Sequence, residues 1–515
     1  MSVLPLLAPA LLALASLDLI VRPVGRAHAR LMLPEGAALA AFAVGIVSAM
    51  GLAFGFGNAP AVAVEGLGAL VLTDVVSVAM ALTVSFIGWA VLRFSRIALD
   101  GEARQGAFMG WMSLTLAGAL IFVTAGNLVQ IFIGWAAMVI ALRRLILFYP
   151  EREGARLALT KKSWCDAMAG AALVGASVLL WSGFGTGDIA EITAMARDGS
   201  VPSTLWLAAA LIAFAGVAIS AVMPLHGWLT EVMEAPTPVS ALLHAGVVGA
   251  GGFLLIRFAD VLLAAPEVLA VLALVGGLGA LVGAAVALTQ PAIKTALAWS
   301  TCAQMGFMML QCGLALFPLA LLHIVAHALY KAHAFLSSGT AVEAVAAIRR
   351  PGPVAVPNGR AVARAFGIAL SIFIAVGLVF GLADKAPQAV ALGAILVFGV
   401  AYLLAQGLAD AAPRALTWRT AALSAIATVT YFTFHVGAEL LTAGTLPPPP
   451  APDGLAWAVI VLAVVSFGFA AIAQATFPLW AGHPAVAGLR VHLMNGLYLN
   501  ALGNRLAGRW SQKEV

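Results

Sequence analysis

Histidine and lysine side chains recur at helical spacing in the segment LLHIVAHALYKAHAFLSSG. His323, His327 and Lys331 are each four residues apart. This spacing drifts by only about 40° per step, so the three side chains share one stripe of a helix while His333 points elsewhere. Imidazole and buried amine groups exchange protons near physiological pH, so this stripe could pass protons. Alternatively, the histidines bond backbone carbonyls or neighbouring helices.

A predicted helix break lies in AGVAISAVMPLHGWLTEVMEAPTPVSALLHAG. Pro224 lacks an N–H and clashes with the preceding turn, and a bilayer tolerates such a break only where protein or water satisfies the freed carbonyls. Interrupted helices of this kind mark ion pathways in transporters. Glu231 and Glu234 follow the break and could instead form a solvated helix end. On the next helix, Ser240 and His244 are spaced i, i+4, and His244 is a polar group in mid-span.

Two further stretches carry polar residues between apolar runs. Lys294 lies near the end of the tenth predicted span, close enough to reach the membrane surface. The same span continues with Ser300, Thr301 and Gln304. Later, GLVFGLADKAPQAV places Asp384 and Lys385 between two apolar runs. This second interruption is either another helix break or a short loop.

Composition indicates whether these polar groups lie in water or in a lipid bilayer. The 515 residues are 63% hydrophobic and 10% charged, against roughly 25% charged in a soluble globular protein. The sequence therefore predicts an all-α polytopic membrane protein. We expect about fifteen spans, at residues 4–21, 36–56, 70–92, 106–124, 127–147, 166–184, 204–223, 237–258, 262–288, 292–312, 315–341, 362–382, 387–407, 415–442 and 456–478. The first run has no positive residues before it, so it is interpreted as a retained helix.

Positive residues gather after the odd-numbered spans. The groups are Arg22, Arg26 and Arg30; Arg93, Arg96 and Arg104; Arg143, Arg144, Arg152, Arg156, Lys161 and Lys162; Arg349, Arg350, Arg360 and Arg364; Arg414 and Arg419; Arg490, Arg505, Arg509 and Lys513. By the positive-inside rule, the N-terminus is extracytoplasmic and the C-terminus cytoplasmic. The net charge of +5 is thus a topology signal rather than a sign of nucleic-acid binding.

The sequence offers no motif for a bound cofactor or metal. Cys165, Cys302 and Cys312 have no CxxC spacing and no accompanying ligand cluster. The chain has neither a GxGxxG after a predicted strand nor a P-loop. We therefore expect a transporter subunit rather than an enzyme, with no catalytic residue, metal or cofactor of its own.

Three motifs in this order carry a family resemblance: PLHGWLTEVMEAPTPVSALLHAG, IKTALAWSTCAQMGFM and HALYKAHAFLSSG. They resemble the antiporter-like, NuoL-like membrane subunits of respiratory complex I. The resemblance extends from about Gly126 to Glu343 and implies two inverted five-helix repeats with a broken helix in each. It also implies that His244, Lys294, His327 and Lys331 match proton-pathway positions. On this basis we divide the chain into N-terminal helices (1–104), a first repeat (105–260), a second repeat (261–410) and C-terminal helices with a cytoplasmic amphipathic tail (411–515).

Two departures concern the first repeat. Where the complex I subunit has GWEG, this chain reads GWAA, which puts Ala136 at the position of a glutamate. Ile219 stands where the family has a lysine, five residues before Pro224. The first repeat is therefore not expected to pump by the family's usual route.

The segments IALRRLILFYPEREGARLALTKKSWCDA, LYKAHAFLSSG and VHLMNGLYLNALGNRLAGRW resemble the DabB family, the membrane subunits of two-component inorganic carbon transporters. This resemblance implies a soluble DabA-like partner related to zinc β-carbonic anhydrases, with the zinc in that partner. It implies that a cation, H⁺ or Na⁺, flows through the membrane subunit of a bacterial inner membrane and energises uptake of CO2 or bicarbonate. The alternatives are a proton-pumping subunit of a NADH–quinone oxidoreductase or hydrogenase complex, a subunit of a sodium/proton antiporter, and a non-conducting anchor.

Overall fold

Each long apolar run of the sequence is a helix in the computed structural model, which describes residues 3–21, 28–55, 62–340, 357–409 and 414–511. The helices before the break are α1 (Leu7–Val21, preceded by the short η1, Leu4–Leu6), α2 (His28–Ala53), α3 (Val75–Ala98), α4 (Gln105–Val123), α5 (Leu128–Ile146), α6 (Glu153–Phe184), α7 (Ile189–Arg197) and α8 (Leu205–Ile219). A hairpin of two-residue strands, β1 (Ala63–Val64) and β2 (Gly68–Ala69), joins α2 to α3.

The elements after the break begin with α9 (Gly227–Glu231), η3 (Val232–Glu234), α10 (Thr237–Leu242), the π turn η4 (Leu243–Val247), α11 (Gly249–Arg257), α12 (Ala259–Leu263), α13 (Pro266–Ala287), α14 (Ile293–Gly313) and α15 (Phe317–Leu336). They continue with α17 (Gly359–Val379), η5 (Leu382–Asp384), α18 (Pro387–Gly407), α19 (Arg414–Thr442), α20 (Gly454–Ala475), α21 (Phe477–Trp480), α22 (Pro484–Met494), η6 (Gly496–Tyr498) and α23 (Leu499–Ser511).

Twelve of the described helical segments are long and apolar enough to cross a membrane. Each of the fifteen predicted spans contains a helix. The three outside the twelve are α1 and α8, which are shorter, and α14, which carries polar residues along its length. The prediction of an all-helical polytopic membrane protein is therefore confirmed.

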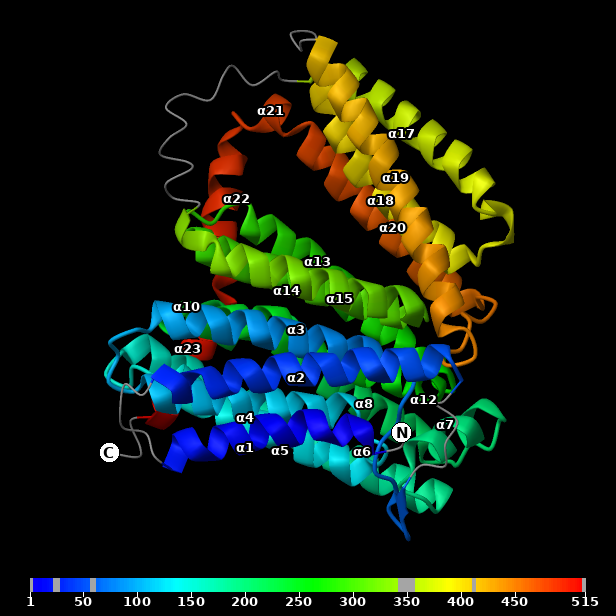
Figure 1. The fold of residues 1–515 in the computed structure, drawn as a ribbon. Coiled ribbons are helices and arrows are strands. Elements are labelled where there is room, and N and C mark those ends of the chain that lie inside the picture. Colours follow the sequence, from blue (N-terminus) through cyan, green and yellow to red (C-terminus); the bar gives the residue numbers. More distant parts are fainter. Residues whose placement is uncertain (1–2, 22–27, 56–61, 341–356, 410–413, 512–515) are drawn as a thin grey trace.

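The helices form a body, a separate module and a returning tail (Figure 1). Helices α1 to α15 lie roughly side by side in the body. Helices α17 to α20 form a C-terminal module that is tilted against the body and meets it at one end. The tail, α21 to α23, then runs back across the other end of the body.

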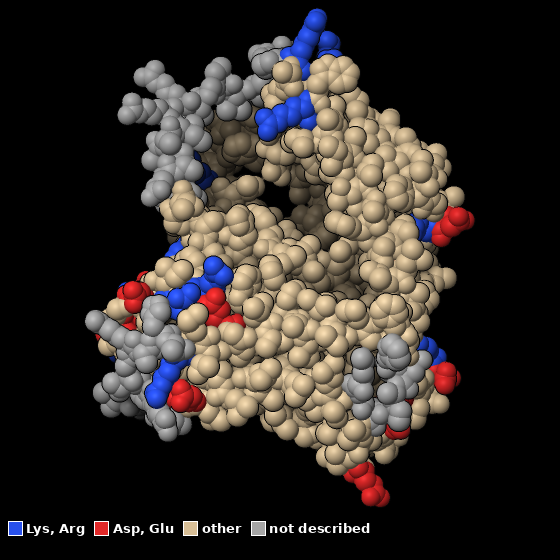
Figure 2. All heavy atoms as spheres, viewed as in Figure 1, with Lys and Arg blue, Asp and Glu red and all other residues tan. Residues whose placement is uncertain are grey.

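On the face drawn in Figure 2, charged side chains lie toward the edges, and most of the surface between them is uncharged. We call the end that carries Arg143, Arg144 and Arg152 the basic end, and the other the opposite end. Between the body and the C-terminal module this face is deeply hollowed. Arg22, Arg26, Arg349, Arg350 and Lys513 of the predicted topology signal lie outside the described residues.

Two sequence interpretations are decided by helix boundaries. Residues 380–386 separate two distinct helices, α17 and α18, and contain only the short η5, so this interruption is a loop between neighbouring helices. Lys161 and Lys162, predicted to lie in a basic loop, are instead within α6, because that helix begins at Glu153.

Candidate ion pathway

The break predicted at Pro224 is present. Helix α8 ends at Ile219, and helical structure resumes with α9 at Gly227. The Ser220 hydroxyl at the break donates a hydrogen bond to the carbonyl of Val248, at 2.8 Å. The break is thus tied by a side chain to the start of α11, as expected where non-helical backbone is buried within a membrane protein.

A π turn places the first functional side chain. Within η4 the N–H of Val248 bonds the carbonyl of Leu243, at 3.2 Å, one residue further back than in an α-helix. The carbonyl of His244 is therefore free of its α-helical donor. Nε2 of His327 on α15 donates a hydrogen bond to this carbonyl instead, at 3.2 Å. The π turn thus joins two of the predicted pathway histidines directly.

Lys331 and His244 both contact the same turn of α14. Lys331 donates to the carbonyl of Leu297, at 2.9 Å, and to the hydroxyl of Ser300. The hydroxyl of Thr301 donates to the same Leu297 carbonyl, at 3.0 Å, and contacts Nδ1 of His244, also at 3.0 Å. When the single Thr301 proton goes to the Leu297 carbonyl, His244 donates to Thr301 from Nδ1. Its Nε2 is then a bare acceptor, buried and without a partner among the described residues.

His323 extends the network along α15. Its ring centroid lies 6.0 Å from that of His327. Its Nδ1 is 2.7 Å from Oε1 of Gln311, and its Nε2 is 2.9 Å from Oε1 of Gln304. A neutral imidazole donates from one nitrogen only, so one amide must turn its NH₂ toward the ring when His323 is neutral. A proton can thus be accepted or released here by rotating an amide.

The remaining predicted residues lie at the basic end. Lys294 begins α14 and donates to the hydroxyl of Thr237, at 2.8 Å. Glu231 pairs with Lys161, at 2.7 Å. The side chain of Glu234 is 52% exposed and pairs with Arg152, at 3.6 Å, in the manner of a solvated helix end. The structure therefore brings His244, His323, His327 and Lys331 together and places the other three nearer the surface.

Comparison with known proteins shows the family to which the chain belongs. Residues 125–388, just over half of the chain, match the family described as NADH:quinone oxidoreductase/Mrp antiporter, transmembrane. The chain belongs to this family. It is 36% identical, over 98% of its length and 93% of the relative's, to the probable inorganic carbon transporter subunit DabB2 of Halothiobacillus neapolitanus. It is therefore a homologue of the DabB subunits.

Other relatives of this antiporter family match more narrowly. The probable inorganic carbon transporter subunit DabB of Hydrogenovibrio crunogenus is 40% identical over 50% of this chain and 51% of its own. NADH-ubiquinone oxidoreductase chain 5 of Metridium senile is 36% identical over 53% of this chain and 46% of its own. Among solved structures, the Mrp complex of Dietzia superimposes with a TM-score of 0.60 at 22% identity, covering 98% of this chain and 60% of that one. This last likeness shows the antiporter-like fold alone.

The region predicted to form the first repeat is apolar at Ala136 and Ile219, where the resemblance to complex I subunits implied a charged pair. Ile219 is buried at the end of α8. A cavity of about 30 Å³ lies between α3, α4, α5 and the π turn, and its lining includes the apolar side chains of Met80, Leu116 and Met138. Ala136 and Ile219 offer no proton-exchanging group, so a path through this region would need other residues.

Sequence reasoning missed two ion pairs on α6 of the antiporter fold. Lys162 contacts both oxygens of Asp166, at 2.7 and 2.9 Å, and its side chain is 4% exposed. Lys162 also lies over the ring of Trp228, just past the break. Lys161 binds Glu231 and Asn500. The i, i+4 spacing of Lys162 and Asp166 was a visible signal, but it fell in a segment interpreted as a basic loop.

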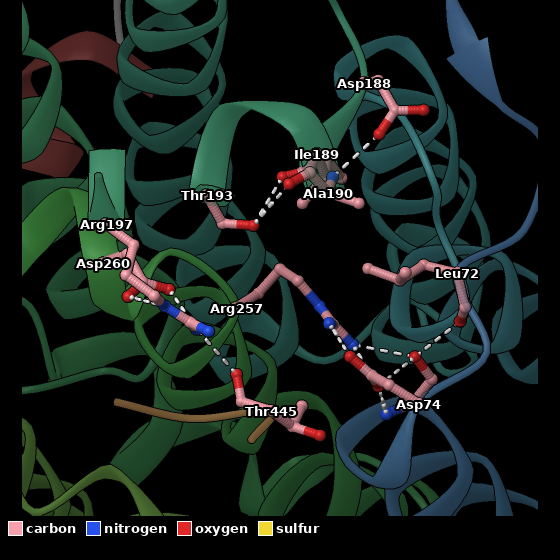
Figure 3. Close-up of polar contacts among 11 residues, drawn as sticks. Leu72, Asp74, Asp188, Ile189, Ala190, Thr193, Arg197, Arg257, Asp260 and Thr445 are labelled. Atoms are coloured by element: carbon pink, nitrogen blue, oxygen red, sulfur yellow. Dashed lines mark hydrogen bonds and ion pairs between the residues drawn. The ribbon is translucent and has the colours of Figure 1, made fainter. Parts of the chain in front are cut away.

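A third polar cluster holds the opposite end of α11 (Figure 3). Arg257 contacts both oxygens of Asp74, the N-cap of α3, and Arg197 on α7 binds both oxygens of Asp260. Burial raises the pKa of the Asp74 carboxyl, but the Arg257 charge and hydrogen bonds from Arg257 and Ser77 outweigh it, so that the pKa lies below its ordinary value. A carboxylate and a guanidinium therefore pair stably here and anchor the helix that carries His244.

Proposed function

We propose that this DabB homologue conducts a cation, H⁺ in the first place, across the membrane and that this flow energises inorganic carbon uptake. The observation that carries the proposal is the buried network of His244, His327 and Lys331 on α14, α15 and the π turn. His244 and Lys331 have no exposed surface, and His327 is 6% exposed. Buried ionisable groups within membrane helices are costly and are characteristic of ion routes.

The network offers consecutive proton-binding groups. Lys331 and His244 meet the same turn of α14 through Ser300 and Thr301. His244 presents an unpartnered Nε2 that can take up a proton. His327 lies between the two other histidines: its Nε2 donates to the carbonyl of His244, and its ring meets that of His323 edge to face. Lys294 and Glu231 would be the proton-binding groups of the route at the basic end.

The membrane orientation belongs to the same proposal. The basic end carries Arg143, Arg144 and Arg152 and would face the cytoplasm of a bacterium, with the N-terminus outside. A soluble DabA-like zinc protein would dock there. The loop that begins after α5 and the tail α22 to α23 are its candidate docking surfaces, since both lie at the basic end. Cation flow through the subunit would then drive one-way hydration of CO2 or bicarbonate accumulation by the partner.

The test is rescue of a bacterial strain that lacks carbonic anhydrase and fails to grow in air. Co-expression of this chain with the soluble protein encoded beside it should restore growth, and Lys331→Ala should abolish the rescue. Leu329→Ala is the matched control, because Leu329 lies two residues away on α15 and is exposed. Rescue by Lys331→Ala equal to the parent would mean that the proposed relay through Lys331 is wrong. A neighbouring set of quinone-oxidoreductase subunits instead of a zinc protein would favour a respiratory complex.

A further inference from the structure

We propose that the inward face of α19 lines a second proton route, separate from the His244 network, which ends at Lys385, Glu439 and His435. This inference rests on the proposal that the chain conducts protons. The face consists of hydroxyl, imidazole and carboxyl groups at three- or four-residue spacing along the whole helix. Its members are Thr417, Thr420, Ser424, Thr428, Tyr431, His435, Glu439 and Thr442.

Helix α19 has the reverse of the usual polarity of a surface helix. The buried residues of its polar face include Thr420, Ser424, Thr428 and His435. Its exposed residues are large and apolar: Trp418, Leu423, Ile426, Val429, Phe434, Leu440 and Leu441. The apolar face therefore suits lipid, and the polar face is packed against α15, α17 and α18. A polar stripe turned away from lipid is typical of a helix that lines a water-filled path.

Several buried polar atoms on this path have no protein partner among the described residues. They are Oγ of Ser424, the hydroxyl of Tyr431, Nδ1 of His435 and Oε1 of Gln388 on α18. An unpaired buried polar atom costs about 1–3 kcal/mol, and water commonly satisfies such groups. Hydroxyls that merely back-bond their own helix, as Thr428 does to Ser424, do not account for these four atoms.

The spacing suits a chain of water molecules. Steps of three or four residues separate neighbouring groups by about 4.5–6 Å along the axis, which one water with two hydrogen bonds can bridge. From Thr417 to Thr442 the stripe is roughly 38 Å long, enough to cross a hydrocarbon core of about 30 Å. The route can therefore be continuous from one surface to the other.

The charged group at the opposite end provides the proton-transfer site. Nε2 of His435 lies 3.0 Å from Oε1 of Glu439, and the other oxygen of Glu439 binds Lys385. The His435 side chain is 2% exposed, whereas that of Glu439 is 39% exposed. His435 can accept a proton at its unpaired Nδ1 and pass the Nε2 proton to the Glu439 carboxylate. The resulting carboxylic acid then releases that proton to water, and reorientation of the imidazole turns its remaining N–H toward Glu439 and a bare nitrogen toward the path for the next proton.

The test measures proton flux into liposomes that contain the purified full-length chain, with a pH-sensitive dye inside and a potassium diffusion potential as the driving force. In a Lys331→Ala background, where the His244 network does not conduct, His435→Phe and Glu439→Gln should each lower the remaining flux at least tenfold. Ser424→Leu should block the route in the same way, whereas Ser371→Leu, at an exposed position of α17, should leave the flux unchanged. Thermal unfolding and gel-filtration profiles establish which variants are folded.

A second measurement reports hydration without relying on flux. The S424C variant should react with a small, charged, water-soluble thiol reagent at least tenfold faster than the three native cysteines, which are buried. A protected S424C, or undiminished remaining flux when folded His435→Phe is combined with Lys331→Ala, would overturn the α19 route while leaving the His244 network in place. A parent chain that passes no protons would contradict the proposed function as well.

Discussion

At the scale of single residues, the site depends on which group donates and which accepts each hydrogen bond. The carbonyl of His244 is free because of the π turn, and His327 is its donor. Nδ1 of His244 in turn contacts the hydroxyl of Thr301, and its Nε2 has no partner among the described residues. His327 therefore has a structural role as a hydrogen-bond donor and, in the proposed pathway, a chemical role as a proton carrier. The two roles can be separated by substitution.

Replacing His327 by glutamine should preserve the first role and remove the second. An amide still donates to the His244 carbonyl but does not titrate, so we expect normal thermal stability and, in a His435→Phe background that closes the α19 route, at least tenfold lower proton flux. His327→Leu should lose both and should cost about 1–3 kcal/mol of stability, because it leaves a buried carbonyl unpaired. Thermal unfolding and liposome flux measure the two effects. Undiminished flux for His327→Gln in the His435→Phe background would remove His327 from the pathway.

The Asp74 to Arg257 pair should be insensitive to pH across the physiological range. A carboxyl with a lowered pKa in the folded state contributes stability that is fully present above its unfolded pKa and is lost only as the pH falls through the folded value. Asp74→Asn should therefore lower stability by about 3 kcal/mol, by the same amount at pH 6 and pH 8. Glu267→Gln, at an exposed site on α13, should have little effect. A loss confined to one of these pH values would contradict the assignment.

At the scale of helices, the break and the π turn form one unit because α8 and α11 approach each other closely. A Cβ atom on Gly251 would lie 2.2 Å from the carbonyl oxygen of Gly216 and 2.3 Å from Oγ of Ser220. Only glycine at position 251 permits this contact. The bond from Ser220 to the Val248 carbonyl lies beside it. The geometry of the pathway thus depends on backbone contact as well as on polar side chains.

Gly251→Val should separate the two helices and disturb the network without changing any titratable group. We expect a loss of at least 2 kcal/mol, in the range of overpacked cores, and reduced flux in whatever protein still folds. Gly277→Val on α13 is the matched control, since a Cβ there would meet its nearest neighbour at 3.9 Å. Thermal unfolding in detergent compares the two. Equal stability of both variants would show that α8 and α11 can move apart freely.

Some features of the helices could be predicted from the sequence, and others could not. The apolar runs predicted the helices, Pro224 predicted the break, and the spacing of His323, His327 and Lys331 predicted a shared face. The π turn could not be predicted, because its register depends on contacts with α8 and α15 that are distant in sequence. Nor could the polar face of α19, since serine and threonine in a membrane helix are satisfied equally by their own backbone, and only packing shows which face is buried.

At the scale of the whole molecule, the tail connects the last helices to the first repeat. Gln290 donates to the carbonyl of Met494, at 3.2 Å, and Gly496 lies against the ring of Trp299. Asn500 then donates to the hydroxyl of Thr230, at 2.8 Å, and accepts from Lys161. The tail therefore covers the basic end beneath the helix break, beside the pair of Lys161 and Glu231.

Cysteines at the tail contact should form a cross-link within one chain. In the double variant Thr230→Cys with Asn500→Cys, the two side chains replace a hydrogen-bonded pair, so mild oxidation should join α9 to α23. A shift in mobility on a denaturing gel, reversed by a reductant, detects the bond, and each single variant is the control. Dimers in place of the intramolecular product would contradict the position of the tail.

The π turn has one more consequence, for comparing related chains. It holds one residue more than an α-helical turn would need. Deleting a single residue there, such as Val247, would restore regular helix and rotate α10 by about 100° relative to α11. Arg257 would keep its partner Asp74, while His244 would leave Thr301 and His327. A relative could therefore retain every motif of this family and still lack the pathway, and the only trace would be a one-residue gap in the alignment.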